Sequence, residues 1–158
     1  MRVWIDTEFN GFEGDLISLA LVDEVGRSFY RYMPCHMPSD WVAQNVLPVL
    51  GMYRPEPVGA QPALKHPSNF WSLRRIQFAL QQWLEVYDCV HIVADWPEDI
   101  AQFCRVLITG PGLRIDTPPL TMEVRRDLDA ESLVPHNALE DARAMRAVHL
   151  AYEKAGCL

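Results

Sequence analysis

The chain has 158 residues, of which 49% are hydrophobic and 22% are charged, and its formal net charge is −7. This length is most simply one domain, residues 1–158, and it suffices to bury a substantial core. The negative charge argues against a protein that binds nucleic acid by bulk electrostatic attraction. No apolar run approaches the ~20 residues of a membrane span, and the four scattered cysteines, with no signal-like N-terminus, lead us to expect a cytoplasmic protein with reduced thiols.

The N-terminal third predicts three antiparallel strands joined by short turns. Strands are expected at 2–6, 16–22 and 28–33, with glycine-containing turns at 10–14 and 23–26. The nearly continuous apolar run at 16–22 is typical of a strand that is covered on both faces.

The rest of the chain predicts helices that alternate with strands. Helices are expected at 41–46, 68–87, from Asp95 to about Ile108, at 120–128, and from Asn137 to about Lys154, with strands at 89–94 and 113–116 and a long proline-rich loop at 48–67. This order predicts an α/β fold: a mixed five-stranded sheet, with three antiparallel strands first, flanked by helices.

Two carboxylates stand one residue apart at the end of the first predicted strand. Asp6 and Glu8 project from the same face, because residues i and i+2 of a strand share a face. Held that close, they raise each other's pKa unless a positive charge lies near them. Their oxygen atoms suit a hard cation such as Mg²⁺ or Mn²⁺, whereas a plain surface pair is the simpler alternative. Further carboxylates decide between the two.

The last predicted helix carries an aspartate on its core-facing side. Its apolar stripe runs through Met145, Val148 and Tyr152, and one turn before Met145 stands Asp141. A buried carboxylate needs a partner, so we expect Asp141 near a cation, although a favourable interaction with the helix N-terminus would also explain it.

The helix from Asp95 to Ile108 repeats this pattern. Phe103 and Leu107 face inward, and one turn before Phe103 stands Asp99. Asp95 is expected to cap the helix, which is a sufficient role for it. We therefore favour Asp99 over Asp95 as a metal-site residue.

His136 lies five residues before Asp141, just ahead of the last helix. Its ordinary pKa suits proton transfer near neutral pH. A histidine that follows a proline is also an ordinary loop residue, so its role depends on the carboxylates around it.

The set Asp6, Glu8, Asp99, His136 and Asp141 resembles the DEDDh superfamily of 3′→5′ exonucleases. The first motif is Ile5-Asp6-Thr7-Glu8-Phe9, and the third runs from His136 to Asp141 with the spacing His-x₄-Asp. The second motif departs from the common His-Asn pattern, since residues 94–99 read Ala-Asp-Trp-Pro-Glu-Asp; aligning Asp95 with the asparagine puts Asp99 on the family's carboxylate. Over nearly the whole chain the sequence is similar to the small bacterial polyadenylate-specific 3′-exoribonuclease AS group. This similarity rests on the small size and on Trp41-Val42, Val46-Leu47-Pro48 and Phe70-Trp71-Ser72-Leu73-Arg74-Arg75-Ile76.

This resemblance implies a ribonuclease H-like fold and hydrolysis of single-stranded RNA from its 3′ end, with release of nucleoside 5′-monophosphates. It implies two divalent cations, Mg²⁺ or Mn²⁺, held by Asp6, Glu8, Asp99 and Asp141, with Asp6 facing both. His136 would be the general base. The four carboxylates and two cations balance in charge.

Fewer signals bear on substrate contacts and partners. Phe9 would stack on the terminal base or belong to the core, and Thr7 and Asn10 beside it are expected to contact substrate. The pairs Arg74-Arg75 and Arg125-Arg126 would guide the strand or simply lie in solvent.

The assembly state is also left open by the residues. Aromatic residues fit either a homodimer face, which the resemblance favours, or a small apolar cluster under the long loop; they are Trp41, Tyr53 and Trp71.

Three other functions use the same residues. A proofreading or repair 3′→5′ exodeoxyribonuclease shares the chemistry, and nothing in the sequence indicates recognition of a 2′-hydroxyl. A metal-dependent hydrolase of small nucleotides is a second alternative, and a catalytically inactive binding module is a third, although such a module has no need of all five residues.

Overall fold

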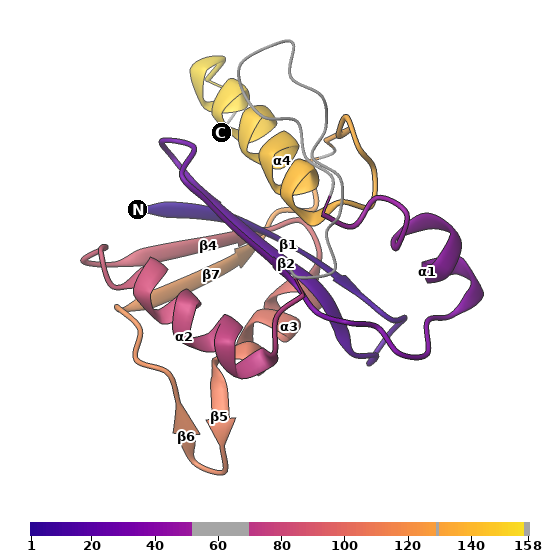
Figure 1. Cartoon of the computed structure of the whole chain (residues 1–158). Coiled ribbons are helices and arrows are strands. Elements are labelled where there is room, and N and C mark those ends of the chain that lie inside the picture. The colour runs from indigo at the N-terminus through magenta and orange to yellow at the C-terminus, as the bar shows by residue number, and fades with distance from the viewer. Residues whose placement is uncertain (52–69, 129, 157–158) are drawn as a thin grey trace.

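The computed structural model describes residues 1–51, 70–128 and 130–156 (Figure 1). In chain order the elements are β1 (Arg2–Phe9), β2 (Leu16–Asp23), β3 (Ser28–Tyr32), α1 (Asp40–Asn45), α2 (Leu73–Leu84), β4 (Val90–Ala94), α3 (Pro97–Leu107), β5 (Ile108–Gly110), β6 (Leu113–Arg114), β7 (Leu120–Val124) and α4 (Ala138–Lys154). Five of the strands form one mixed sheet in the order β3-β2-β1-β4-β7. β1 pairs antiparallel with β2, as β2 does with β3, whereas β1–β4 and β4–β7 are parallel. The predicted α/β fold, with three antiparallel strands first, is confirmed.

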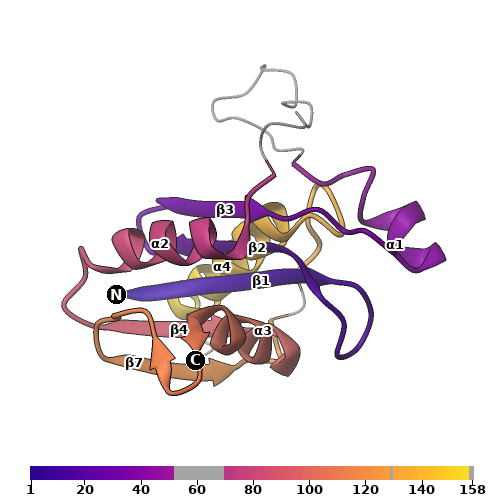
Figure 2. The ribbon, with the colours of Figure 1, turned by 60° about the horizontal axis from the view of Figure 1, so that its bottom comes forward.

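Helices cover both faces of this sheet. In Figure 2, α2 and α3 lie in front of the strands and α4 lies behind them. Alternate residues of β1 supply the two core layers: Val3 and Ile5 pack with residues of α2 and α3, whereas Trp4 packs with Met145 of α4. Every residue of β2 is buried, as expected for a strand that is covered on both faces.

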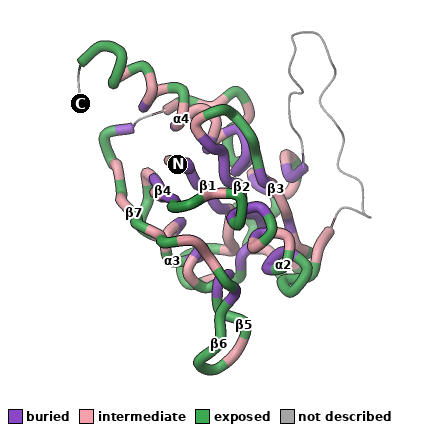
Figure 3. Tube along the Cα trace, turned by 90° about the vertical axis from the view of Figure 1, so that its left-hand side faces the viewer, coloured by how far each residue is buried: buried purple, intermediate pink, exposed green. Residues whose placement is uncertain are grey.

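Two predictions in the second half of the chain are wrong. Residues 113–116 do not join the five-stranded sheet. Leu113–Arg114 is strand β6, which pairs with β5 in a short hairpin that projects from the molecule and is largely exposed (Figure 3). Residues 120–124, expected to begin a short helix, form edge strand β7 beside β4. The sequence Leu-Thr-Met-Glu-Val alternates with the period of a strand, and this pattern prevails after Pro119.

The helix expected at 68–87 is shorter than predicted. It begins at Leu73, after the N-cap Ser72, and ends at Leu84. Leu73, expected in the buried stripe, is 42% exposed, whereas Ile76, Leu80 and Trp83 are buried. Residues 68–69, Tyr53 and most of the predicted loop at 48–67 lie outside the described residues. Among the described helices, none has the length and apolar character to cross a membrane.

Candidate functional site

The sheet has a gap at one end, because β1 is longer than β4. β4 pairs with β1 only as far as Trp4 and ends at Ala94, so β1 continues beyond its parallel neighbour from Asp6 onward. A β-bulge between Glu8 and Phe9 changes the register with β2 just after the second carboxylate. Such bulges redirect side chains and are frequent beside active sites.

A cavity of about 710 Å³ lies at this end of the sheet. It contains all five residues that the sequence predicted for the site, together with Asp95. Its walls consist of Asp6, Thr7, Glu8, Phe9, Gly11, Phe12, Ser39, Trp41, Val42, Asp95, Trp96, Asp99, His136 and Asp141. A second opening of about 500 Å³ also reaches Asp6, Asp95, His136 and Asp141, from the side of residues 130–135.

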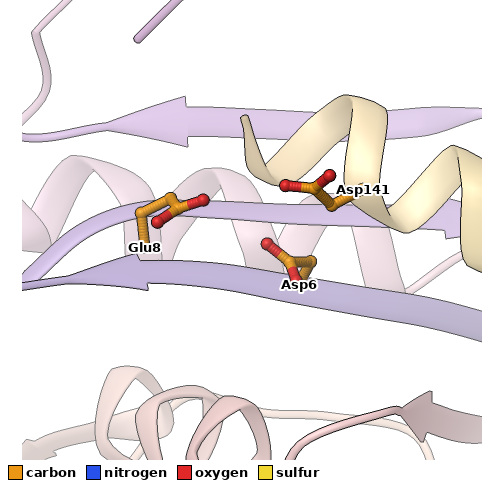
Figure 4. Close-up of side chains that lie close together, drawn as sticks. All are labelled: Asp6, Glu8 and Asp141. Carbon is orange, nitrogen blue, oxygen red and sulfur yellow. The ribbon is translucent and has the colours of Figure 1, made fainter. Parts of the chain in front are cut away.

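Asp6 belongs to two separate carboxylate groups. Ligand oxygens of Asp6, Glu8 and Asp141 lie within 4.8 Å of one another, and so do those of Asp6, Asp95 and Asp99. Figure 4 shows the first group: Asp6 and Glu8 point from β1 toward Asp141 in the first turn of α4. The predicted face shared by Asp6 and Glu8 and the predicted inward position of Asp141 therefore agree with the geometry.

Asp99 is held by the backbone and side chain of Thr7. Its Oδ1 accepts hydrogen bonds from the Thr7 amide at 2.9 Å and from the Thr7 hydroxyl at 2.6 Å. Asp99 is 3% exposed and Thr7 is 5% exposed. Thr7 was expected to contact substrate, but its hydroxyl donates a hydrogen bond to Asp99 instead.

Asp95 does not cap α3, contrary to the prediction. The N-cap is Trp96, without a side-chain hydrogen bond, and Pro97 follows in the first turn. The carboxylate of Asp95 instead lies with Asp6 and Asp99. The signal that could have found Asp95 is its position directly after β4, since the carboxyl ends of parallel strands meet at one edge of a sheet.

The pKa values of all five carboxyl groups are raised, chiefly by burial. For Asp6 the pKa lies well above the ordinary value of 3.8, because burial is reinforced by repulsion from Asp99, Glu8 and Asp141. Burial and the neighbouring aspartates raise the pKa of Glu8 to about 8.

Unlike Asp6 and Glu8, the other three carboxyl groups have partners that favour their charged forms. Burial raises the pKa of Asp99 to about 7, although the Thr7 hydroxyl opposes the shift. The pKa values of Asp95 and Asp141 are raised by burial too, against a lowering effect of Arg126 on Asp95 and of Ser132 and His136 on Asp141. These partners offset only part of the negative potential.

This donor set fits hard divalent cations. The two groups offer carboxylate oxygens alone, the ligands that Mg²⁺ and Mn²⁺ prefer. The crowded carboxylates raise each other's pKa in the absence of a cation, and a cation between them would remove that cost.

His136 lies at the rim of the cavity in an unusual backbone conformation. Its φ is 63°, in the left-handed region that residues other than glycine rarely adopt. The imidazole ring meets the Trp41 ring edge-on, with centroids 4.9 Å apart. Next to it, Asn137 caps α4 through the Glu140 amide and donates to the Val49 carbonyl at 2.9 Å. These contacts restrain the turn that places His136 in the cavity wall with the carboxylates.

Aromatic side chains surround the carboxylates, and sequence reasoning missed two of them. Phe9 and Trp41 had been noted, but Phe12, which is 75% exposed, and Trp96, which is 38% exposed, had not. Both follow glycine or aspartate in turns beside the motifs, which is the signal that could have found them. Asn10 does not line the cavity: its side chain binds the Met37 carbonyl and the Ser39 amide.

The sequence matches no model of a known protein family and no curated protein with which it was compared.

Proposed function

We propose that the chain is a metal-dependent 3′→5′ exonuclease of the DEDDh superfamily, with a ribonuclease H-like fold, that trims single-stranded RNA from its 3′ end and releases nucleoside 5′-monophosphates. One observation carries the proposal: Asp6 belongs to two carboxylate groups beside His136 in a single cavity. Two-cation hydrolysis of a phosphodiester needs oxygen ligands for two neighbouring cations. It is also aided by a group that accepts the proton of the attacking water.

The residues divide between two cation positions. Asp6, Glu8 and Asp141 would hold one, and Asp6, Asp95 and Asp99 the other. Bound divalent cations would stabilise the attacking and leaving oxygens of an in-line displacement at phosphorus. Asp95 thus joins the set that the sequence resemblance implied, and Asp99 keeps its place in it.

His136 would accept the proton from the attacking water. It lines both openings of the site, so it adjoins the Asp6–Glu8–Asp141 group and solvent alike. Its electrostatic interaction with Asp141 lowers the pKa of that carboxyl group, against the larger raising effect of burial. The Trp41 ring packs edge-on against the imidazole and so restricts the orientation of His136.

The aromatic walls support a single strand as the substrate. Phe9, Phe12, Trp41 and Trp96 line the cavity, and bases stack on such rings with little dependence on sequence. Because the protein carries a net charge of −7, the bound cations, rather than the protein as a whole, would attract the substrate phosphate. Nothing in these contacts distinguishes ribose from deoxyribose, so a 3′→5′ exodeoxyribonuclease uses the same residues.

A metal-dependent hydrolase of small nucleotides is the second candidate. The cavity of about 710 Å³ is within the range typical of small-molecule sites. Mononucleotides and oligonucleotides therefore both belong in the test.

The decisive experiment compares 5′-labelled single-stranded RNA and DNA of one sequence, and a mononucleotide, with Mg²⁺, Mn²⁺ or a chelator. We expect a cation-dependent ladder that shortens from the 3′ end of RNA. The Asp6→Asn variant should lose the ladder, because Asp6 serves both cation positions, whereas Asp116→Asn, an exposed acid away from the cavity, should retain it.

Other outcomes would redirect the assignment. A ladder on DNA alone would replace the exoribonuclease by a repair-type exonuclease. Turnover of the mononucleotide alone would favour the small-nucleotide hydrolase. Cation binding without turnover of RNA, DNA or the mononucleotide would contradict the proposal that the chain is an enzyme.

A further inference from the structure

A second cavity, of about 450 Å³, lies on the α2–α3 side of the sheet. It is bounded by the β1–β2 turn, the N-terminal end of α2 and the middle of α3; its lining residues include Gly14, Trp71, Ser72, Gln102 and Arg105. Trp71 is fixed there by its backbone amide, which donates to the Tyr32 carbonyl at 2.9 Å. Gln102 closes another edge by donating to the Gly14 carbonyl at 3.1 Å.

Two guanidinium groups lie on the Trp71 ring. The Cζ atom of Arg75 is 3.7 Å from the ring centroid and that of Arg31 is 4.4 Å from it. We refer to Arg31, Trp71 and Arg75 as the arginine–tryptophan cluster. Stacking on an aromatic face satisfies the flat surface of a guanidinium but leaves its N–H donors, which lie in its plane, free to bind other groups.

The cluster lacks a counter-charge within the part of the chain that the structure describes. No carboxylate there lies within ion-pair distance of either arginine. Arg31 is half-buried, its Nη1 donates to the Tyr30 carbonyl, and its buried Nε has no hydrogen-bond partner among the described residues. Burial and the charge of Arg75 both lower the pKa of Arg31. Two like charges on one ring, one of them half-buried, are unfavourable unless an anion joins them.

The helix that carries Arg75 adds to this positive potential. The N-terminal end of α2 bears a partial positive charge, which acidic residues ordinarily offset. Its first turn has no acidic residue, and Arg74 and Arg75 occupy that turn instead. Ser72, the N-cap, lines the second cavity, as does Arg105 from α3. The carboxylates on this cavity are Glu13 and Asp15, on the β1–β2 turn at its other side.

We propose that the arginine–tryptophan cluster and the adjoining α2 end of the second cavity form a phosphate-binding site. Planar guanidinium groups bind phosphate oxygens through paired N–H donors, and a helix N-terminus adds amide donors of the same kind. One bound phosphate would join Arg31 and Arg75 and offset the repulsion between their charges.

The two cavities adjoin, which indicates a source for the phosphate. Gly11 and Phe12 line the first cavity, and the next residues of the same turn, Glu13 and Gly14, line the second. On α3, Asp99 lines the first, and Gln102 and Arg105 line the second. These positions are about 5–9 Å apart along the helix axis. A single strand whose 3′ end lies at Asp6 would therefore bring an upstream phosphodiester to the cluster. This choice of source rests on the proposed function, whereas the phosphate site itself does not.

The first test is thermal unfolding in chelator, with inorganic phosphate compared with sodium chloride at equal ionic strength. Chelator removes cations from the first cavity, so phosphate cannot bind there through metal. We expect phosphate to raise the Tm of the wild type in proportion to site occupancy. Arg75→Gln should abolish this rise and weaken phosphate binding about tenfold or more, measured by calorimetry. In chloride its Tm should equal or exceed that of the wild type, because the variant relieves repulsion.

Arg74→Gln is the matched control. It removes the same charge from the same turn of α2, yet Arg74 is exposed and has no contact with the Trp71 ring among the described residues. Arg31→Gln should behave as Arg75→Gln does; if its burial prevents folding, the Arg75 variant suffices. An equal loss in Arg74→Gln would overturn the proposal in favour of bulk charge. If Arg75→Gln lowered the Tm equally in phosphate and in chloride, the role of Arg75 would be structural stacking on Trp71 alone. The absence of any specific effect of phosphate on the Tm of the wild type would also overturn the proposed phosphate site.

The second test identifies the source with an oligonucleotide of about eight nucleotides, a length within the range of single-strand sites. It carries no terminal phosphate, and binding is measured by fluorescence anisotropy in chelator. Weaker binding by Arg75→Gln than by Arg74→Gln would establish the strand as the source. Equal binding by the two variants would reject the strand and support a free phosphate. Failure of RNA hydrolysis, by contrast, would leave the phosphate titrations unaffected.

Discussion

Asp6 is the residue on which the site depends, since both carboxylate groups include it. Its pKa is raised by burial and by four neighbouring carboxylates. A group in that setting is costly in the folded protein unless a proton or a cation joins it. The charge state of the site should therefore follow both pH and cation concentration.

The cation-free protein should lose stability as pH rises. The pKa values of Asp99 and Glu8 are about 7 and about 8 in the folded chain, against 3.8 and 4.5 ordinarily. Between about pH 4 and pH 8 the folded state binds more protons than the unfolded state does, so the free energy of unfolding falls with increasing pH. Each difference of one in pKa corresponds to about 1.4 kcal/mol.

Urea unfolding in chelator across this pH range measures the effect. Mg²⁺ should restore stability at the alkaline end, and Asp99→Asn should flatten the slope. Stability that rises through the same range in chelator would show that these carboxyl groups are not protonated in the folded protein.

Thr7→Val should weaken cation binding while the fold is retained. The substitution keeps the shape of the side chain but removes the hydroxyl that donates to Asp99 at 2.6 Å. The pKa of Asp99 should rise further, and loss of such a supporting hydrogen bond typically costs about 10–100-fold in metal affinity.

Titration with Mn²⁺ at fixed pH measures this loss. Thr121→Val on β7, which removes a hydroxyl that contacts His91 at 2.6 Å, is the matched control. Equal Mn²⁺ affinities for wild type and Thr7→Val would contradict the supporting role of Thr7.

At the scale of elements, sequence patterns located β2 by its continuous apolar run between turns, and α4 by its apolar stripe and N-cap. β7 was missed because its alternation spans only five residues, which is too short to distinguish a strand from the start of a helix. Pro118 and Pro119 also suggested that the sheet had ended, whereas the Pro119 carbonyl accepts from the Val90 amide and starts the pairing. Asp95 was misassigned because a cap is a local explanation, whereas its carboxylate lies beside Asp6 of distant β1.

The turn before α4 gives a prediction at this scale. Asn137→Ala removes the helix cap, at a cost of about 1 kcal/mol, and also removes the hydrogen bond to the Val49 carbonyl that restrains the turn of His136. Asn137→Ser restores a cap oxygen but not that hydrogen bond. We expect the serine variant to regain stability while both variants lose turnover, by up to about 10²-fold, because misplacement of the general base proposed at His136 is that costly.

Thermal unfolding and single-turnover assays separate the two effects. If the serine variant regained full turnover, the contact with Val49 would have no part in catalysis.

At the scale of the whole molecule, the site is assembled from segments far apart in the chain. Asp6 and Glu8 come from β1, Asp95 and Asp99 follow β4, and Asp141 lies on α4. The sequence could predict the sheet and most of these residues, because strand and helix periods fix the faces on which they lie. The cavity walls and the arginine–tryptophan cluster could not be predicted in that way, since they depend on turns and on contacts between distant elements.

The same arrangement bears on how long the folded state lasts. Short turns join β1, β2 and β3, so these strands pair between residues that are close in the chain. The parallel pairing of β1 with β4 and the packing of α4 join residues about a hundred positions apart, and the entropy cost of closing such long loops delays these steps of folding. Each of the two proposed cation positions takes ligands from β1 and from one of these distant segments, so a cation would gain its full set only after the rate-limiting step of folding. At a cation concentration about 100 times its Kd, we expect unfolding to slow about 100-fold while the refolding rate is unchanged.

Stopped-flow chevrons with Mg²⁺ or chelator measure both rates, and Asp6→Asn should remove the difference. Faster refolding in Mg²⁺ would instead mean that the carboxylates meet before the transition state. With late assembly, bound cations lengthen the lifetime of the folded protein without shortening the time it needs to fold.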